Sequence, residues 1–431
     1  MRRFCAIAVL ALWVAGLGVE AAGVERFPPP DFETGYEFPE TTTPAPRALG
    51  WEYFDVAVLA AALGAATWLT YTKRSRRGIF ALMVFSALYF GFWRKGCVCA
   101  IGAIQNVTLT LFDSTYAIPL TAAAFFILPL AFALFVGRTF CAGVCPLGAL
   151  QDMVLLRPVR VPRWLEGALR LFAWGYLAAA VVFAATGSAF VICRYDPFIG
   201  FYRLGGNLSI IVIGVCFLLV GVFVGRPYCR FVCPLSILLR QFSRLSKRRV
   251  TITPDRCITC RLCEDACPFG AIVGPTAAWD EGDYVRNKKL LGALLALVPV
   301  FVLLLGWAGH GLSGRAARVH DTVRLADRIY LENVGAVTDT TDASDAFRAS
   351  GKTVEALYAE AEAKRGQFAV AGWLAGGFMG LIVGVKLVRT TLRERRTEYE
   401  VDKAACVACG RCYEYCPRQH ALDKARREGA T

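Results

Sequence analysis

The stretch C-I-T-C-R-L-C-E-D-A-C-P at residues 257–268, with its counterpart C-V-A-C-G-R-C-Y-E-Y-C-P at residues 406–417, constrains the fold of this chain more than any other part. Both stretches follow the spacing of bacterial ferredoxins, in which three close thiolates grip one [4Fe-4S] cluster and the fourth cysteine reaches the other cluster. A pair of zinc sites is the alternative, but zinc ribbons seldom use three cysteines so closely spaced. The sequence therefore predicts two [4Fe-4S] clusters.

The cross-over of the fourth cysteine decides which residues act together. One cluster is expected on Cys257, Cys260, Cys263 and Cys416, and the other on Cys406, Cys409, Cys412 and Cys267. Neither motif completes a cluster alone. We therefore expect the two separated segments to assemble into one bacterial two-cluster ferredoxin-like α+β module.

The remainder of the chain is too apolar for a water-soluble domain. Of its 431 residues 56% are hydrophobic, and the mean hydropathy is +0.47. Apolar segments that approach or exceed the length of a membrane span lie at 51–72, 79–93, 118–136, 171–192, 208–224, 290–307 and 368–388. The expected fold class is an α-helical membrane protein with about seven transmembrane helices, the shortest at 79–93.

The charge pattern orients these spans. The formal net charge is +14, yet the Lys and Arg residues stand in short clusters beside apolar runs, as they do in positive-inside loops, which argues against nucleic-acid binding. Arg94 and Lys95 are the exception, on the opposite side. We expect a bacterial inner (cytoplasmic) membrane protein with a periplasmic N-terminus and a cytoplasmic C-terminus.

The organisation along the chain follows from this orientation. Residues 1–23 are predicted to be a signal peptide, with an uncleaved first span as the alternative. The other expected parts are a Pro-rich periplasmic segment at 24–50, a five-span membrane domain at 51–250, a first cytoplasmic ferredoxin half at 251–289, a span at 290–307, a periplasmic loop at 308–367, a span at 368–388 and a second ferredoxin half at 389–431. Two spans separate the two halves, so both return to the same side.

A second cysteine pattern occurs twice at the ends of predicted spans. The phrase V-G-R-T-F-C-A-G-V-C-P-L at 136–147 is repeated as V-G-R-P-Y-C-R-F-V-C-P-L at 224–235, which indicates an internal repeat. The four cysteines are Cys141, Cys145, Cys229 and Cys233. Their spacing suits one face of a helix, and the proline suits the first turn of the next helix. We expect a further iron-sulfur cluster or another redox role here, against the alternative of packing cysteines.

A third cysteine group is predicted on the periplasmic side. The segment C-V-C-A-I-G-A-I-Q-N at 97–106 echoes C-P-L-G-A-L-Q-D at 145–152, and a lone cysteine follows the span at 171–192. The residues concerned are Cys97, Cys99 and Cys193. A metal or redox site and an extracytoplasmic disulfide explain them equally well.

These motifs resemble the NapH and NosR type of membrane polyferredoxin, above all its NosR branch. The resemblance covers most of residues 51–420 and implies electron transfer across the inner membrane. The implied partners are the membrane lipid, a periplasmic reductase or maturation system and, since the flavin domain that usually precedes the spans has no room here, a separate flavoprotein. Three histidines, none within an apolar run, argue against membrane haem.

Three functions are open at this point. The first is an electron conduit, from the ferredoxin clusters to the repeat cysteines and the periplasmic cysteines. The second is a quinol dehydrogenase-like subunit that has no substrate chemistry of its own and takes electrons from quinone in the membrane. The third is a redox-sensing or metalloenzyme-assembly factor whose clusters report rather than conduct.

Overall fold

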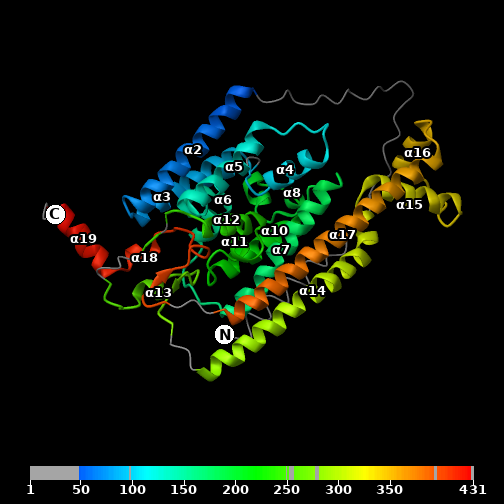
Figure 1. The fold of residues 1–431 in the computed structure, drawn as a ribbon. Coiled ribbons are helices and arrows are strands. Elements are labelled where there is room, and N and C mark those ends of the chain that lie inside the picture. The colour runs from blue at the N-terminus through cyan, green and yellow to red at the C-terminus, as the bar shows by residue number, and fades with distance from the viewer. Residues whose placement is uncertain are drawn as a thin grey trace.

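The computed structural model describes residues 48–96, 99–248, 250–251, 257–276, 281–392 and 396–428. The predicted signal peptide, most of the predicted Pro-rich segment and Cys97 lie outside these residues. The described part is an α-helical bundle flanked by one long helix pair, with a small two-stranded sheet at one end (Figure 1). The expected fold class, a helical membrane protein with a ferredoxin module, is confirmed.

The bundle is built from the segment expected to hold five spans. Its longer helices are α2 (Leu49–Tyr71), α3 (Arg76–Ser86), α5 (Leu120–Val136), α7 (Arg163–Ala185), α10 (Leu208–Gly221) and α12 (Pro234–Arg244). Its shorter elements are the π-helix η1 (Ala87–Trp93), α4 (Ala103–Phe112), the π-helix η2 (Phe140–Val144), α6 (Pro146–Met153), α8 (Val191–Tyr195), α9 (Ile199–Arg203) and α11 (Pro227–Phe231). One buried apolar core runs through α2, α5 and α7.

Four described helices are long and apolar enough to cross a membrane. They are Leu49–Tyr71, Trp164–Ala185, Tyr284–Ala317 and Val354–Thr391. Helices α4, α5 and α10 are apolar but shorter. The segment expected at 79–93 forms α3 followed by η1, and the span expected at 171–192 begins and ends about seven residues earlier, at Arg163 and Ala185. There Thr186 caps the helix, and Gly187 adopts a positive φ of 69° that favours glycine.

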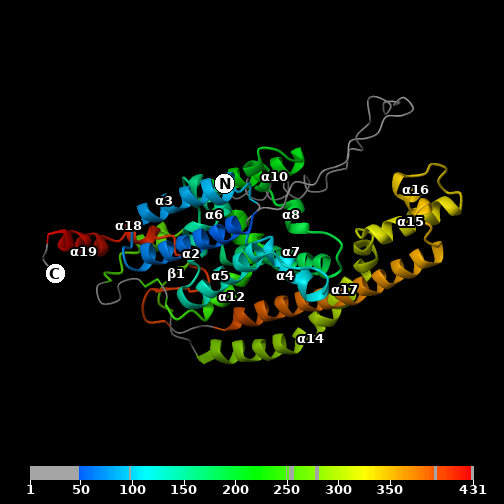
Figure 2. The ribbon, with the colours of Figure 1, turned by 90° about the horizontal axis from the view of Figure 1, so that it is seen from above.

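Two long helices, α14 (Glu281–Ala317) and α17 (Val354–Thr391), run side by side along the flank of the bundle (Figure 2). Glycines occupy their contact: a Cβ atom on Gly376 would overlap the backbone oxygen of Leu305, and one on Gly380 would overlap that of Phe301. With Gly372 and Gly384 they form a G-x3-G-x3-G-x3-G row on α17. Such rows let membrane helices pack backbone to backbone.

At the far end of this pair lie α15 (Asp321–Asn333) and α16 (Asp342–Ala349), which pack with the start of α17 on a small apolar core (Figure 1). The turn before α17 ends in a helix cap, since Thr353 accepts a hydrogen bond from Ala356 N at 3.3 Å.

The ferredoxin segments meet at the opposite end of the molecule. Strand β1 (Ile272–Val273), from the first half, pairs antiparallel with β2 (Glu400–Val401), from the second, with Ile272 opposite Val401. Three short helices complete the module: α13 (Leu262–Ala266), α18 (Arg411–Glu414) and α19 (Pro417–Arg427). The module is thus assembled across the intervening helix pair.

Arg94, an exception to the charge rule, has an acidic partner. Its guanidinium lies 2.9 Å from the carboxylate of Asp55 on α2, which is fully buried and also accepts a hydrogen bond from Tyr89 Oη at 2.8 Å. A buried carboxylate in a span needs such a cationic partner. The pair therefore offsets the charge of Arg94.

Candidate iron-sulfur sites

Two cavities of the ferredoxin module contain four cysteines each. Cys257, Cys260, Cys263 and Cys416 line one cavity. Cys267, Cys406, Cys409 and Cys412 line the other. Each cavity therefore combines three cysteines of one motif with the fourth cysteine of the other, which is the grouping that cross-over ligation requires.

Burial favours the protonated form of two of these thiols. It raises the pKa of Cys406 to about 12 and that of Cys263 to about 11. At neutral pH such thiols keep their protons unless a cation replaces them. Iron fits this donor set, because it is bound by the thiolate and stabilises it.

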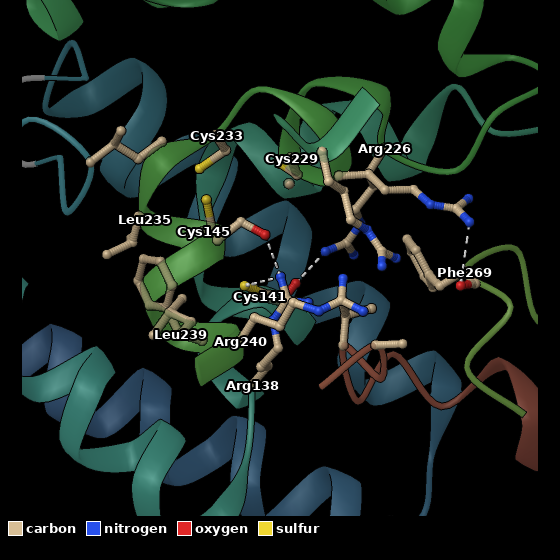
Figure 3. A pocket seen from close by; sticks show the side chains of 18 residues that line it. Arg138, Cys141, Cys145, Arg226, Cys229, Cys233, Leu235, Leu239, Arg240 and Phe269 are labelled. Atoms are coloured by element: carbon tan, nitrogen blue, oxygen red, sulfur yellow. Dashed lines mark hydrogen bonds between the residues drawn. The ribbon is translucent and has the colours of Figure 1, made fainter. Parts of the chain in front are cut away.

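The repeat brings its four cysteines into a third cavity. Cys141, Cys145, Cys229 and Cys233 line it together with Phe269 and Val407 of the ferredoxin module. Figure 3 shows the side chains of Cys145 and Cys233 entering this space from two different segments of the repeat. Residues from the two copies of the repeat thus meet at one place.

The local backbone differs from the single helical face expected for each cysteine pair. Cys141 lies in the π-helix η2, whereas Cys145 has an extended backbone, with ψ 116°, and begins α6. Cys233 begins α12 in the same way, with ψ 117°. The reason is the proline that follows, because a residue before proline is pushed out of the helical region. The expectation that proline occupies the first helical turn is confirmed in both copies.

Arginines surround this third cavity. Arg138, Arg170, Arg226, Arg230 and Arg240 line it, and among the described residues no acidic side chain does. The Nε atoms of Arg138 and Arg170 are buried without a hydrogen-bond partner. Buried cations need negative charge nearby, and carboxylates outside the cavity lining supply part of it: Asp152 pairs with Arg226, and Glu166 pairs with Arg170 and Arg230. An iron-sulfur cluster held by thiolates is an anion, so the residues present fit such a group, which would be held by the four cysteines and would exchange single electrons when bound.

Arginine side chains also fix the ferredoxin module against the repeat. Arg138 Nη1 donates to Ala404 O at 3.3 Å, and its Nη2 lies 3.7 Å from the sulfur of Cys141. Arg230 Nη1 donates to Pro268 O at 2.9 Å, next to Cys267. The same arginines that supply positive charge to the cavity therefore bind the backbone of both ferredoxin halves.

Asp152 on α6 is the anion at the centre of this interface. Its carboxylate is fully shielded from solvent and pairs with Arg76, with Arg226 at 3.3 Å and with Arg411 at 3.5 Å. Burial alone would raise the pKa of Asp152, but Arg226, Arg76 and Arg411 together hold it well below its usual range. One carboxylate thus joins the bundle, the repeat and the second ferredoxin half.

Two of the cysteines predicted on the periplasmic side line a fourth cavity. Cys99 and Cys193 face it with Asp196, whose carboxylate is 2% exposed. Asp196 Oδ1 accepts a hydrogen bond from Phe198 N at 2.8 Å, and its Oδ2 has no partner. Burial raises the pKa of this carboxyl to about 6. Cys99 is a free thiol in this structure.

The cysteine cavities are neighbours. Phe269 and Val407 line both the repeat cavity and the second ferredoxin cavity. Cys145 lines the repeat cavity and an adjoining one that also contains Cys99. Cys99 in turn lines the cavity of Cys193. The loop with Cys99 therefore reaches into the bundle interior, closer to the repeat than a surface loop between spans would lie.

Several of these features have no signal in the sequence. The repeated arginine in V-G-R marks Arg138 and Arg226, but Arg170 and Arg240 resemble ordinary positive-inside residues. The only sequence pattern that includes Asp152 is the segment C-P-L-G-A-L-Q-D, which ends at this residue and resembles the segment at 97–106. Among the described residues no three His, Cys, Asp or Glu side chains gather as the ligands of a single ion do. A cube of four irons spaces its ligands more widely, since each thiolate binds a different iron.

Comparison with known proteins agrees with these sites. Residues 118–167 and 207–253 match one family described as a 4Fe-4S binding domain, and residues 250–273 and 399–419 match another of the same description. The first family covers the two repeat copies and the second covers the two ferredoxin motifs. No solved structure is significantly similar to the chain.

Curated relatives align with part of the chain. YccM of Escherichia coli, whose name proposes electron transport, is 25% identical over 236 residues, which are 46% of this chain and 65% of YccM. The regulatory protein NosR of Stutzerimonas stutzeri is 26% identical over 251 residues, 51% of this chain and 34% of NosR. NirI of Paracoccus denitrificans is 31% identical over 157 residues, 32% of this chain and 22% of NirI. The chain thus spans about a third of the NosR that it matches.

Fold, cysteine sites and family matches together define a helical membrane protein with 4Fe-4S binding domains. Within that class, at modest sequence identity, the chain is a membrane protein of the NosR and NapH type.

Proposed function

We propose that this chain conducts electrons across the bacterial inner membrane, between cytoplasmic [4Fe-4S] clusters or the quinone pool and a periplasmic redox partner. The observation that supports the proposal is the row of neighbouring cysteine cavities, from the ferredoxin module through the repeat to Cys99 and Cys193. A series of redox groups in adjacent cavities is what stepwise electron transfer needs.

Each part has a role in this scheme. The ferredoxin module holds two [4Fe-4S] clusters on the cytoplasmic side, and the repeat cysteines hold a further cluster that supplies one-electron chemistry inside the bundle. The arginines around the repeat cavity offset the charge of that cluster. Cys99 and Cys193 form the exit toward the periplasm, where a flavoprotein, a reductase or a maturation partner takes the electrons.

The names of relatives favour a second candidate. NosR is named as a regulatory protein, so a chain that uses the same clusters to sense redox state is the alternative. A conduit turns over continuously between a donor and an acceptor on opposite sides of the membrane, whereas a sensor takes up a fixed number of electrons and stops.

The test begins with anaerobic purification, counting of iron and sulfide, and EPR. We expect about twelve irons per chain, four for each cluster. The protein is then placed in vesicles with a reductant on one side and an impermeant acceptor on the other. Continuous transfer in the native protein, and its loss in Cys141→Ser or Cys229→Ser with the ferredoxin EPR signals intact, supports the conduit. Eight irons, or transfer that survives both substitutions, contradicts the role of the repeat.

A further inference from the structure

Gln151 is a buried amide beside the repeat cavity, in contact with the cavity residue Cys229, and no function described above employs it. It lies on α6, is fully buried and uses every polar group that its side chain has. Its Oε1 accepts a hydrogen bond from Tyr228 N at 3.0 Å. Its Nε2 donates to Leu147 O at 3.0 Å and to the sulfur of Cys229 at 3.2 Å.

These partners fix the direction in which the amide points. A reversed amide would place its oxygen against the carbonyl oxygen of Leu147 and its nitrogen against the N–H of Tyr228. Both contacts would be repulsive, because each pairs two acceptors or two donors. The N–H of Gln151 therefore faces the sulfur of Cys229.

A matching glutamine occurs near the periplasmic cysteines. Gln105 follows Cys99 at the same spacing as Gln151 follows Cys145. The Oε1 of Gln105 accepts a hydrogen bond from Ile192 N at 3.0 Å, and Ile192 is the residue before Cys193. In the same way, Gln151 accepts from Tyr228 N, and Tyr228 is the residue before Cys229. The two differ in what Nε2 contacts: that of Gln105 donates to Ala189 O at 3.5 Å, whereas that of Gln151 donates to Leu147 O and to a sulfur.

We propose that Gln151 is a positioning residue of the repeat site, which ties the two cysteine arms together and raises the reduction potential of their iron-sulfur cluster through its N–H···S hydrogen bond. A donor to sulfur stabilises the reduced cluster more than the oxidised one, because the reduced cluster carries more negative charge. The proposal rests on the proposed function, which places a cluster at this site.

The test compares Gln151→Met with Gln105→Met. Methionine has a similar length and no donor, and each substitution leaves one buried backbone N–H, of Tyr228 or Ile192, without its acceptor. Redox titration followed by EPR is expected to show a lower reduction potential for the repeat cluster in Gln151→Met. The expected change is tenfold in the equilibrium constant for reduction of the cluster, which is about 59 mV for one electron. The potential is expected to be unchanged in Gln105→Met, and those of the ferredoxin clusters unchanged in both.

A second measurement needs no variant. Native protein isotope-labelled at the glutamine side-chain nitrogens is expected to show a magnetic coupling between that nitrogen and the reduced repeat cluster in pulsed EPR. An unshifted potential in a twelve-iron Gln151→Met protein, or no coupling in a twelve-iron native protein, overturns the role of Gln151 and leaves the conduit standing. A native protein with eight irons overturns both the role of Gln151 and the proposed conduit through the repeat cluster. If the Gln151→Met protein does not retain the repeat cluster, its potential cannot be measured, and the magnetic coupling in the native protein decides whether Gln151 contacts the cluster.

Discussion

Ile272 lies opposite Val401 in the antiparallel strand pair that joins the two ferredoxin halves. The pairing links residues on either side of two long helices, so the ferredoxin module depends on the geometry of that helix pair. The module is a product of the membrane fold rather than a domain attached to it. The predictions that follow test the helix pair, the buried charges and the assignment of ligands.

The glycine row on α17 is the first feature to test. Gly376→Leu places a large side chain where the backbone of α14 already lies, so the helices must separate. We expect the variant to lose iron from the ferredoxin clusters, measured as iron per chain after purification. Gly366→Leu is the matched control, because this exposed glycine of α17 has open space around it. Full iron content in Gly376→Leu would show that the close packing is dispensable.

Asp152 is expected to stabilise the interface between bundle, repeat and module. Asp152→Asn leaves Arg226 buried without its carboxylate partner, which costs about 3 to 5 kcal/mol when a buried pair is broken. The native carboxyl has a pKa below its unfolded value of about 4, so its contribution is fully present above pH 4 and is lost as the pH falls from there toward the lower folded pKa. Thermal unfolding in detergent measures both effects. Asp345→Asn, in an exposed ion pair, should change little.

Asp196 is expected to show the opposite pH dependence. Its pKa is raised to about 6, so the folded protein binds this proton more tightly than the unfolded chain does. Stability from this group therefore falls as the pH rises between about 4 and 6, by about 3 kcal/mol in all. We expect Asp196→Asn to remove that slope from the pH profile of thermal unfolding. A profile that is unchanged in the variant would show that the carboxyl is not the titrating group.

Cross-over ligation makes a prediction about pairs of variants. Cys267→Ser and Cys409→Ser should abolish the same EPR signal, because both residues line one cavity. Cys416→Ser and Cys260→Ser should abolish the other. If Cys267→Ser instead removes the signal that Cys260→Ser removes, each motif would bind its own cluster and the cross-over assignment would be wrong.

The sequence is informative where chemistry imposes spacing. The cysteine motifs predict which residues gather, and the proline after Cys145 or Cys233 predicts where a helix starts. Helix ends are less visible: α14 extends to Ala317 because Gly311 and Ser313 remain compatible with a helix beyond the apolar run. Periodicity reports apolar residues and is silent about a polar residue that continues the helix.

The burial of charged side chains is the feature of the site that leaves no pattern in the sequence. Nothing in the sequence sets Arg170 and Arg240 apart from the other arginines near predicted spans, yet both line the repeat cavity. Asp152 is one acidic residue among many, and only the fold surrounds it with three arginines. A charged residue near a span end is normally solvated, so burial here depends on tertiary contacts that no local pattern records.

The strand pair also has a consequence for biosynthesis. Strand β1 leaves the ribosome long before β2, and until α17 has been inserted beside α14 it has no partner with which to pair. The cysteines at 257–267 therefore lack the second ferredoxin half until the last part of the chain has been translated. The module acquires its complete shape only once nearly the whole polypeptide exists, which ties the timing of cofactor delivery to the completion of synthesis.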